Sequence, residues 1–208
     1  VAGPITRVIA EHVAEGIGRA ERGGYDAYLI RLDTPGGRDT SMRAIVSDIL
    51  ASEVPVIVHI APDGARGASA GAIITFAAHI AAMAPGTTIG AATPVSGGDG
   101  DDLEAKVVND AVAYAEALAE LRDRDPEFLA ETVSEGRSAR GSEALAVGAI
   151  DVVAATTDEL LAAVDGTTVT VAGGRDVVLA TADADIDDHD MGILRSIQQR
   201  LADPNIAF

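Results

Sequence analysis

The 208-residue sequence contains no cysteine and no tryptophan, and only 3% of its residues are aromatic. Without cysteine, a disulfide framework, a thiol nucleophile and a thiolate metal site are all excluded. Hydrophobic residues nevertheless make up 48% of the chain, so its core must consist of Ala, Val, Ile and Leu packed with close backbone approach. The length is sufficient for one large domain with a full hydrophobic core.

Positive charge is also scarce, because 15 Lys and Arg residues face 33 Asp and Glu residues, for a formal net charge of -18. This balance argues against nucleic acid or an anionic membrane as an electrostatic partner. Long hydrophobic runs are missing too. The longest, Ala70 to Ala84, is interrupted by His79 and is too short to span a bilayer, so it predicts a buried core helix.

Lysine is the rarest charged residue, since Lys106 is the only one beside fourteen arginines. Arginine cannot be deprotonated in a protein, whereas a buried lysine can lose its proton and act as a base. The alternative is a general preference for arginine in which Lys106 is an ordinary surface side chain.

Strands and helices alternate along the sequence, which predicts an α/β fold. The Gly-rich and Pro-containing turns between them are typical of a repeated strand-turn-helix unit. Strands are expected over residues 5–10, 25–33, 55–60, 87–92 and 149–154, and helices over residues 13–21, 39–50, 70–84, 103–121, from 126 onward, 142–147 and 157–164.

The sequence after residue 164 differs from this body. Residues 165–190 combine a hairpin signal around Gly173 and Gly174 with an acidic run, and residues 191–208 begin with a predicted terminal helix over 191–202. We expect the hairpin to be an appendage outside the core of residues 1–164. The acidic run predicts a solvated tail, because Asp188 stands where a calcium loop needs a glycine.

A serine between small residues is the first candidate for chemistry. Ser69 lies in Gly67-Ala68-Ser69-Ala70-Gly71, between a predicted strand and an apolar helix. Small neighbours let a substrate carbonyl approach the hydroxyl, and a helix N-terminus offers N–H groups to a developing oxyanion. The alternative is a serine that only caps the helix.

Such a serine needs a base, and no histidine is an obvious partner. His79 lies ten residues further along the same predicted helix, about 15 Å away. Lys106 remains, on a helix whose apolar stripe it flanks, so that its amine reaches a cleft. To act near neutral pH, the pKa of this amine must fall by roughly 3 units from about 10.4, which burial can impose.

The turn from Asp33 to Gly37 is the third element. Its two glycines can expose backbone N–H groups to a substrate with no side chain in the way. The alternative is a plain turn between a strand and a helix.

Together these motifs resemble a known family. The order LDTPGG (Leu32 to Gly37), a strand with Pro55-Val56-Ile57, GARGASAGA (Gly64 to Ala72) and a lysine on the following helix resembles the ClpP/crotonase-fold serine proteases. It is most similar to the NfeD proteases, the stomatin operon partners. The resemblance implies a repeated β-β-α superhelix with a small C-terminal β-hairpin appendage.

The resemblance also implies roles for particular residues. Ser69 matches the nucleophile and Lys106 the general base of a Ser-Lys dyad, with no cofactor and no metal. The Ala70 amide, with Gly36 or Gly37, would form the oxyanion hole. The substrate strand would pair beside Gly37, Arg38, Gly90, Ala91 and Ala92.

A protein of this family is expected to be a membrane-tethered, extracytoplasmic endopeptidase. It would cleave hydrophobic segments of a stomatin-like partner through an acyl-enzyme, as a homodimer, and residues 201–208 match the segment just before the family's membrane-spanning part. Three alternatives stay open: an α/β-hydrolase using Ser69 and His189, a crotonase-type acyl-thioester enzyme, and a degenerate protease domain that serves as a scaffold for a membrane partner.

Overall fold

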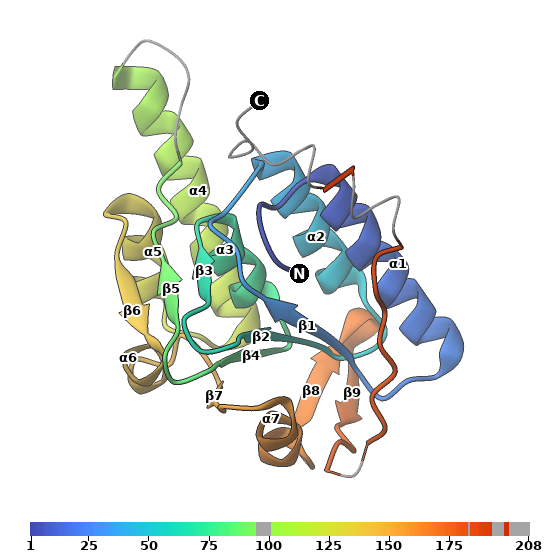
Figure 1. Cartoon of the computed structure of the whole chain (residues 1–208). Helices are drawn as coiled ribbons and strands as arrows, with labels where there is room; N and C mark the ends of the chain where they lie inside the picture. Colours follow the sequence, from blue (N-terminus) through green and yellow to red (C-terminus); the bar gives the residue numbers. More distant parts are fainter. Residues whose placement is uncertain (95–100, 183, 193–197, 200–208) are drawn as a thin grey trace.

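The computed structural model describes residues 1–94, 101–182, 184–192 and 198–199 (Figure 1). Within this part of the chain the strands form three sheets. A parallel sheet has the order β1 (Tyr28–Leu32), β2 (Val56–Ile60), β4 (Ile80–Met83) and β7 (Val152–Val153). The second sheet has the order β3 (Arg66–Ala68), β5 (Thr88–Gly90) and β6 (Ser138–Arg140), and the third is the hairpin of β8 (Thr168–Val171) and β9 (Arg175–Val178).

Helices cover the parallel sheet on both faces. They are α1 (Arg7–Gly23), α2 (Asp39–Ala51), α3 (Ala70–Ala77), α4 (Asp101–Arg122), α5 (Pro126–Ser134), α6 (Gly141–Ala146) and α7 (Thr157–Val164), with a short 3-10 turn η1 (Ala172–Gly174). The larger buried cluster joins α1, α2 and α3 to one face of the sheet, and a smaller cluster joins α7 and the hairpin to the other. Such two-sided cover explains why β2 is buried at every position.

The element order contains a repeat. β2, β3 and α3 are followed by β4, β5 and α4, so that each time a strand of the parallel sheet precedes a strand of the second sheet and then a helix. This mixed α/β arrangement brings the ends of β1, β3 and β5 together through the pairs Thr34 with Gly67 and Ala68 with Gly90.

The strand expected over residues 5–10 is wrong, because α1 already begins at Arg7. The Thr6 hydroxyl caps this helix by accepting a hydrogen bond from the Ile9 N–H. Ile9, Val13 and Ile17 are buried at helical spacing. A short apolar run permits either structure, and here the cap and the burial against the sheet select the helix.

The single helix expected over residues 70–84 is also wrong. α3 ends at Ala77, and after a two-residue connection β4 begins at Ile80 and pairs in parallel with β2. Every residue from Ala70 to Ala84 is buried, so the run carries no periodicity that separates a buried helix from a buried strand.

The hairpin is not outside the core. Val169, Val171 and Leu179 are buried in the smaller cluster, together with Ile57 of β2 and Leu160 of α7. The alternation of apolar and polar residues in β8 therefore marks a strand with one face on the body of the molecule.

The acidic run is not simply a solvated tail. Asp187 accepts hydrogen bonds from the Arg19 guanidinium and the Tyr25 hydroxyl, and His189 stacks on His12 of α1 with ring centroids 4.4 Å apart. Residues 184–190 therefore run alongside α1 (Figure 1). The terminal helix predicted over residues 191–202 falls mostly outside the described residues, as do residues 201–208.

Candidate active site around Ser69

Ser69 occupies a strained position between β3 and α3. Its backbone angles are φ 52° and ψ -117°, a conformation that glycine usually supplies. Strain of this kind at a non-glycine residue persists only where the surrounding structure enforces it, and it is concentrated at functional sites. A serine on a strand-to-helix turn with a strained backbone is the arrangement that presents a nucleophilic hydroxyl.

The glycine at position 36 makes room for this serine. Gly36 has φ 113°, and a Cβ atom built there would lie 2.7 Å from Ser69 Cβ and 3.2 Å from Ser69 Oγ. The two predicted motifs, LDTPGG and GASAG, therefore meet directly at the Ser69 hydroxyl. Thr34 joins them further, because its N–H donates to the Arg66 carbonyl at 2.7 Å and its carbonyl accepts from the Ala68 N–H at 3.1 Å.

Two backbone N–H groups beside Ser69 donate to no residue in the described part of the chain, those of Gly37 and Ala70. The Gly36 N–H is already used, because it donates to Thr34 Oγ1 at 3.1 Å. Between the two predicted donors, the contacts thus favour Gly37. Ala70 stands at the buried N-terminus of α3, so its N–H group and that of Gly37 stay the predicted donors to an oxyanion.

The segment Gly90 to Ala92 also meets Ser69, but its hydrogen bonds are largely occupied. The Gly90 carbonyl accepts from the Ser69 N–H at 2.8 Å, the Ala91 N–H donates to Arg137 at 3.0 Å, and the Ala92 N–H donates to Thr132 at 2.9 Å. β5 lies between β3 and β6. The Gly90 carbonyl thus holds the turn at Ser69, while the Ala91 and Ala92 N–H groups bond within the chain. Pairing of a substrate strand with this segment stays a prediction.

Arg38 likewise uses its backbone within the chain, since its N–H donates to the Ile5 carbonyl at 3.0 Å and its carbonyl accepts from the Ser41 and Met42 N–H groups at the start of α2. Its side chain is exposed.

Lys106 is exposed in this structure. It lies in the first two turns of α4, the end of the helix that extends beyond the neighbouring elements (Figure 1). No hydrogen bond or ion pair joins it to another described residue. The predicted placement of a buried amine beside Ser69 is therefore absent from the described part of the isolated chain.

Three of the histidines contact residues other than Ser69. The His79 Nδ1 accepts from the Val56 N–H at 3.1 Å, and burial, with Arg122 and Arg124 nearby, lowers its pKa from 6.5 to about 3. His59 Nε2 lies 3.0 Å from the Ala154 carbonyl, and burial lowers its pKa as well. His189 stacks on His12, away from the residues that meet Ser69, which removes the basis of the α/β-hydrolase alternative.

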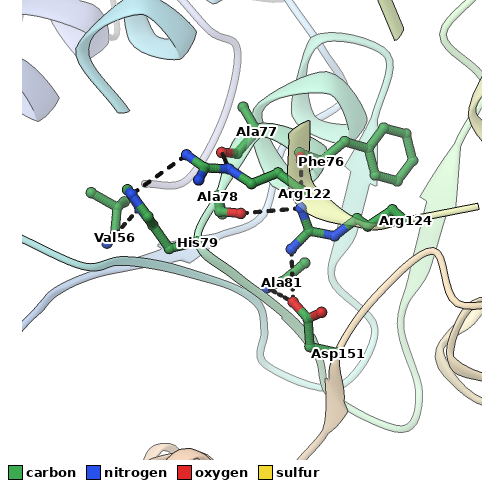
Figure 2. Close-up of polar contacts among 9 residues, drawn as sticks. All are labelled: Val56, Phe76, Ala77, Ala78, His79, Ala81, Arg122, Arg124 and Asp151. Atoms are coloured by element: carbon green, nitrogen blue, oxygen red, sulfur yellow. Dashed lines mark hydrogen bonds and ion pairs between the residues drawn. The ribbon is translucent and has the colours of Figure 1, made fainter. Parts of the chain in front are cut away.

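The opposite end of α3 is held by Arg122, the last residue of α4, and by Arg124, two residues beyond it (Figure 2). The Arg122 Nε donates to the Ala77 carbonyl at 2.8 Å. The Arg124 Nη1 donates to the carbonyls of Phe76 at 2.6 Å and Ala78 at 3.1 Å. Cations at a helix C-terminus also interact favourably with the helix dipole, so this contact fixes the helix that carries Ser69.

The second arginine is itself anchored by a carboxylate. Arg124 Nη2 lies 2.7 Å from Asp151 Oδ2, which also accepts from the Ala81 N–H of β4 at 2.6 Å (Figure 2). Burial lowers the pKa of Arg122 to about 10, which leaves this guanidinium charged at neutral pH. Sequence reasoning missed these residues, and their only sequence signal is the charged cluster at 122–125 immediately after a predicted helix.

This chain is similar in sequence to known membrane-associated proteins of one family. The family described as NfeD1b, N-terminal domain, matches residues 1–172. Membrane-bound protease PH1510 of Pyrococcus horikoshii is 35% identical over 213 residues, which cover 100% of this chain and 48% of that protein. Membrane protein NfeD1b of Bacillus subtilis is 30% identical over 129 residues, covering 60% of this chain and 29% of that protein.

Three solved structures are similar to this chain over most of its length. The 1510-N membrane protease from Pyrococcus horikoshii, described as specific for a stomatin homolog, has a TM-score of 0.86 and 33% identity, covering 98% of this chain and 96% of that chain. A lysine-to-alanine mutant of the 1510-N protease in complex with a substrate peptide has a TM-score of 0.89 and 33% identity, covering 97% and 94%. A serine-to-alanine mutant has a TM-score of 0.83 and 34% identity, covering 90% and 93%.

The chain thus spans about half the length of the Pyrococcus protease. Among the helices in the described ranges, none combines the length and apolar composition needed to cross a bilayer.

Proposed function

Because this chain belongs to the NfeD1b N-terminal domain family, we propose that it is a serine endopeptidase with a Ser69–Lys106 dyad. The observation that carries the proposal is the geometry of Ser69. Its strained backbone presents the hydroxyl at a strand-to-helix turn, against Gly36 and next to the unused N–H groups of Gly37 and Ala70.

The reaction follows from these groups. Neutral Lys106 accepts the proton of the Ser69 hydroxyl while Ser69 Oγ forms a bond to the carbonyl carbon of a peptide. The negative charge that develops on the carbonyl oxygen is stabilised by the Gly37 and Ala70 N–H groups. The lysine ammonium then protonates the leaving amine, and water hydrolyses the acyl-enzyme with Lys106 again as the base.

The exposed position of Lys106 requires that α4 be covered before the dyad works. An amine in water stays protonated at neutral pH, whereas burial favours the neutral form. We propose that the bound substrate, a second copy of the chain in a homodimer, or both cover the first turns of α4 and bring the amine to Ser69. The related 1510-N protease with a lysine replaced by alanine was solved with a substrate peptide, which supports a lysine in this role.

For the substrate we propose a hydrophobic segment of a stomatin-like, membrane-associated protein, with the domain on the extracytoplasmic side and tethered to the membrane through segments beyond this chain. The specificity that the 1510-N protease is described as having for a stomatin homolog supports this choice. The repeated order of two strands and a helix supports a ClpP/crotonase-like fold.

A fluorophosphonate probe and a hydrophobic peptide from a stomatin-like protein test the proposal. Ser69→Ala is expected to abolish both labelling and cleavage, while Ser134→Ala, which changes an exposed serine, leaves both unchanged. Lys106→Ala and Lys106→Arg should each reduce cleavage at least about 100-fold. The arginine variant separates the two roles of the lysine, because it keeps the positive charge and cannot be a base.

Cleavage that survives in Lys106→Arg would refute the base role. Labelling that fails in the parent chain while it still binds the stomatin-like partner would favour the degenerate scaffold. Binding of an acyl-thioester without any covalent Ser69 adduct would favour the crotonase-type enzyme, which uses the same pair of amides.

A further inference from the structure

The backbone of Gly37 is held in place by Ile5. The Ile5 N–H donates to the Gly36 carbonyl at 2.8 Å, and the Ile5 carbonyl accepts from the Arg38 N–H at 3.0 Å. These two bonds bracket Gly37, which pairs with Ile5 in the parallel direction. Because the backbone groups of consecutive residues in an extended segment alternate in direction, the Gly37 N–H points away from Ile5.

The two segments touch backbone to backbone. A Cβ atom built on Gly37 would lie 2.2 Å from the Ile5 carbonyl oxygen and 2.6 Å from the Ile5 nitrogen. Only glycine fits this approach, and Ile5 is itself 1% exposed. A shift of Ile5 therefore moves Gly37 as well.

One buried amide side chain binds both neighbours of Ile5. Gln199 Nε2 donates to the Pro4 carbonyl at 2.7 Å, and Gln199 Oε1 accepts from the Thr6 hydroxyl. Since a carbonyl can only accept, the contact with Pro4 identifies the nitrogen end of the amide. Gln199 is 6% exposed, so residues 198–199 lie against the segment that leads into α1 (Figure 1).

The contact with Pro4 is the one that cannot be replaced within the described residues. Thr6 caps α1 without help from Gln199, because its Oγ1 accepts from the Ile9 N–H at 3.4 Å. The buried Pro4 carbonyl takes no other donor in the described part of the chain. A buried carbonyl left unpaired is costly, so Gln199 fixes the backbone just before Ile5.

We propose that Gln199 is a positioning residue for the oxyanion donor at Gly37. Gln199 holds Pro4 and Thr6, and the bonds of Ile5 between them hold Gly37. This role rests on the proposed function, because the Gly37 N–H matters only if Ser69 forms a tetrahedral adduct. Docking of residues 198–199 thereby sets the reactivity of a serine that is far away in the sequence.

The rate of covalent labelling tests this role. An oxyanion donor contributes about 10²–10³ to the rate, so Gln199→Met, which keeps the length but loses both polar atoms, should slow fluorophosphonate labelling at least about 10-fold. The loss should fall on the maximal rate and not on the half-saturating probe concentration, because the donor acts in the transition state. Gln198→Met changes the exposed neighbour and should leave both quantities unchanged.

Backbone amide exchange measures the same contact without any measurement of activity. The N–H groups of Ile5 and Arg38 form the two bonds that bracket Gly37. Their exchange should be at least about 10-fold faster in Gln199→Met than in Gln198→Met. The Ile45 amide, inside α2, is the internal reference that separates local release of Ile5 from a general loss of stability.

Gln199→Glu provides a second variant if Gln199→Met does not fold. Its carboxylate still accepts from the Thr6 hydroxyl but cannot donate to the Pro4 carbonyl, so labelling should again slow.

Labelling at the parent rate in a folded Gln199→Met chain would overturn the positioning role and leave Ser69 as a nucleophile. If the parent chain is not labelled at all, the proposed function fails. Equal exchange at Ile5 in the two methionine variants would then overturn the contact with Gly37 as well, whereas faster exchange in Gln199→Met would support it.

Discussion

Replacement of Arg124 tests whether the arginine contacts stabilise the helix that carries Ser69. The Arg124 side chain is only 1% exposed, and it reaches the carbonyls of Phe76 and Ala78 as well as the Asp151 carboxylate (Figure 2). The change Arg124→Met keeps an apolar chain of similar length but removes every one of these donors. Two buried carbonyls and one half-buried carboxylate then lose their partner.

The magnitude follows from those losses. A buried acceptor left unsatisfied costs about 1–3 kcal/mol. Two buried carbonyls lose their donor, whereas the Asp151 side chain is 35% exposed and partly hydrated, so a total of about 3–5 kcal/mol is expected. For a chain of this size 1 kcal/mol corresponds to roughly 2–4 °C, so the melting temperature should fall by on the order of 6–20 °C. Urea unfolding followed by circular dichroism measures the free energy of unfolding directly.

Two further variants make this reasoning refutable. Arg140→Met changes an exposed arginine and should alter the free energy of unfolding by less than about 0.5 kcal/mol. Asp151→Asn keeps an oxygen for the Ala81 N–H, so adding it to Arg124→Met should recover part of the loss by removing the uncompensated charge. A loss below about 1 kcal/mol for Arg124→Met would show that the network does not hold α3.

Three other outcomes are expected. Gly36→Ala should lower the free energy of unfolding by about 2 kcal/mol and slow fluorophosphonate labelling at least about 10-fold, because its Cβ meets Ser69; Gly148→Ala, also at positive φ but with open space around it, should leave labelling unchanged. Ser69→Gly should be more stable than Ser69→Ala by about 1 kcal/mol in urea unfolding, because glycine tolerates φ 52°. The pKa of His79 is 6.5 in the unfolded chain and about 3 in the folded one, so the folded state loses stability as the pH drops below about 6.5. His79 should lower the free energy of unfolding by about 2 kcal/mol between pH 7 and 5. His79→Gln should show a smaller fall, and an equal fall would contradict the lowered pKa of His79.

The elements that the sequence predicts best are those with one buried face. α2 and α4 follow their apolar periodicity closely, because only one side of each helix contacts the body. The run from Ala70 to Ala84 lacks that contrast, because every side chain in it is buried. Its division into α3 and β4 depends on pairing with β2 and on Arg122 and Arg124, which are distant in sequence.

The candidate site, too, could be predicted from the sequence only in part. The approach of Gly36 to Ser69 could be predicted, because each motif places small residues where a strand ends. The hydrogen bonds from the Gly36 N–H to Thr34 and from the Ala91 N–H to Arg137 could not be predicted. These bonds depend on a hydroxyl rotamer and on the antiparallel pairing of β6 with β5, neither of which leaves a periodic signal.

In the proposed dyad, Lys106 would connect the apolar stripe of α4 with the chemistry of Ser69. Within that stripe Leu118 is buried, whereas Val107, next to Lys106, is 37% exposed. The neighbouring Lys106 therefore shares an uncovered end of the helix with an apolar side chain. Whatever buries Val107 also removes water from the lysine amine, and desolvation disfavours the charged form. Covering α4 would thus supply hydrophobic binding energy and generate the neutral base in one step, which would confine the reactivity of Ser69 to the assembled complex.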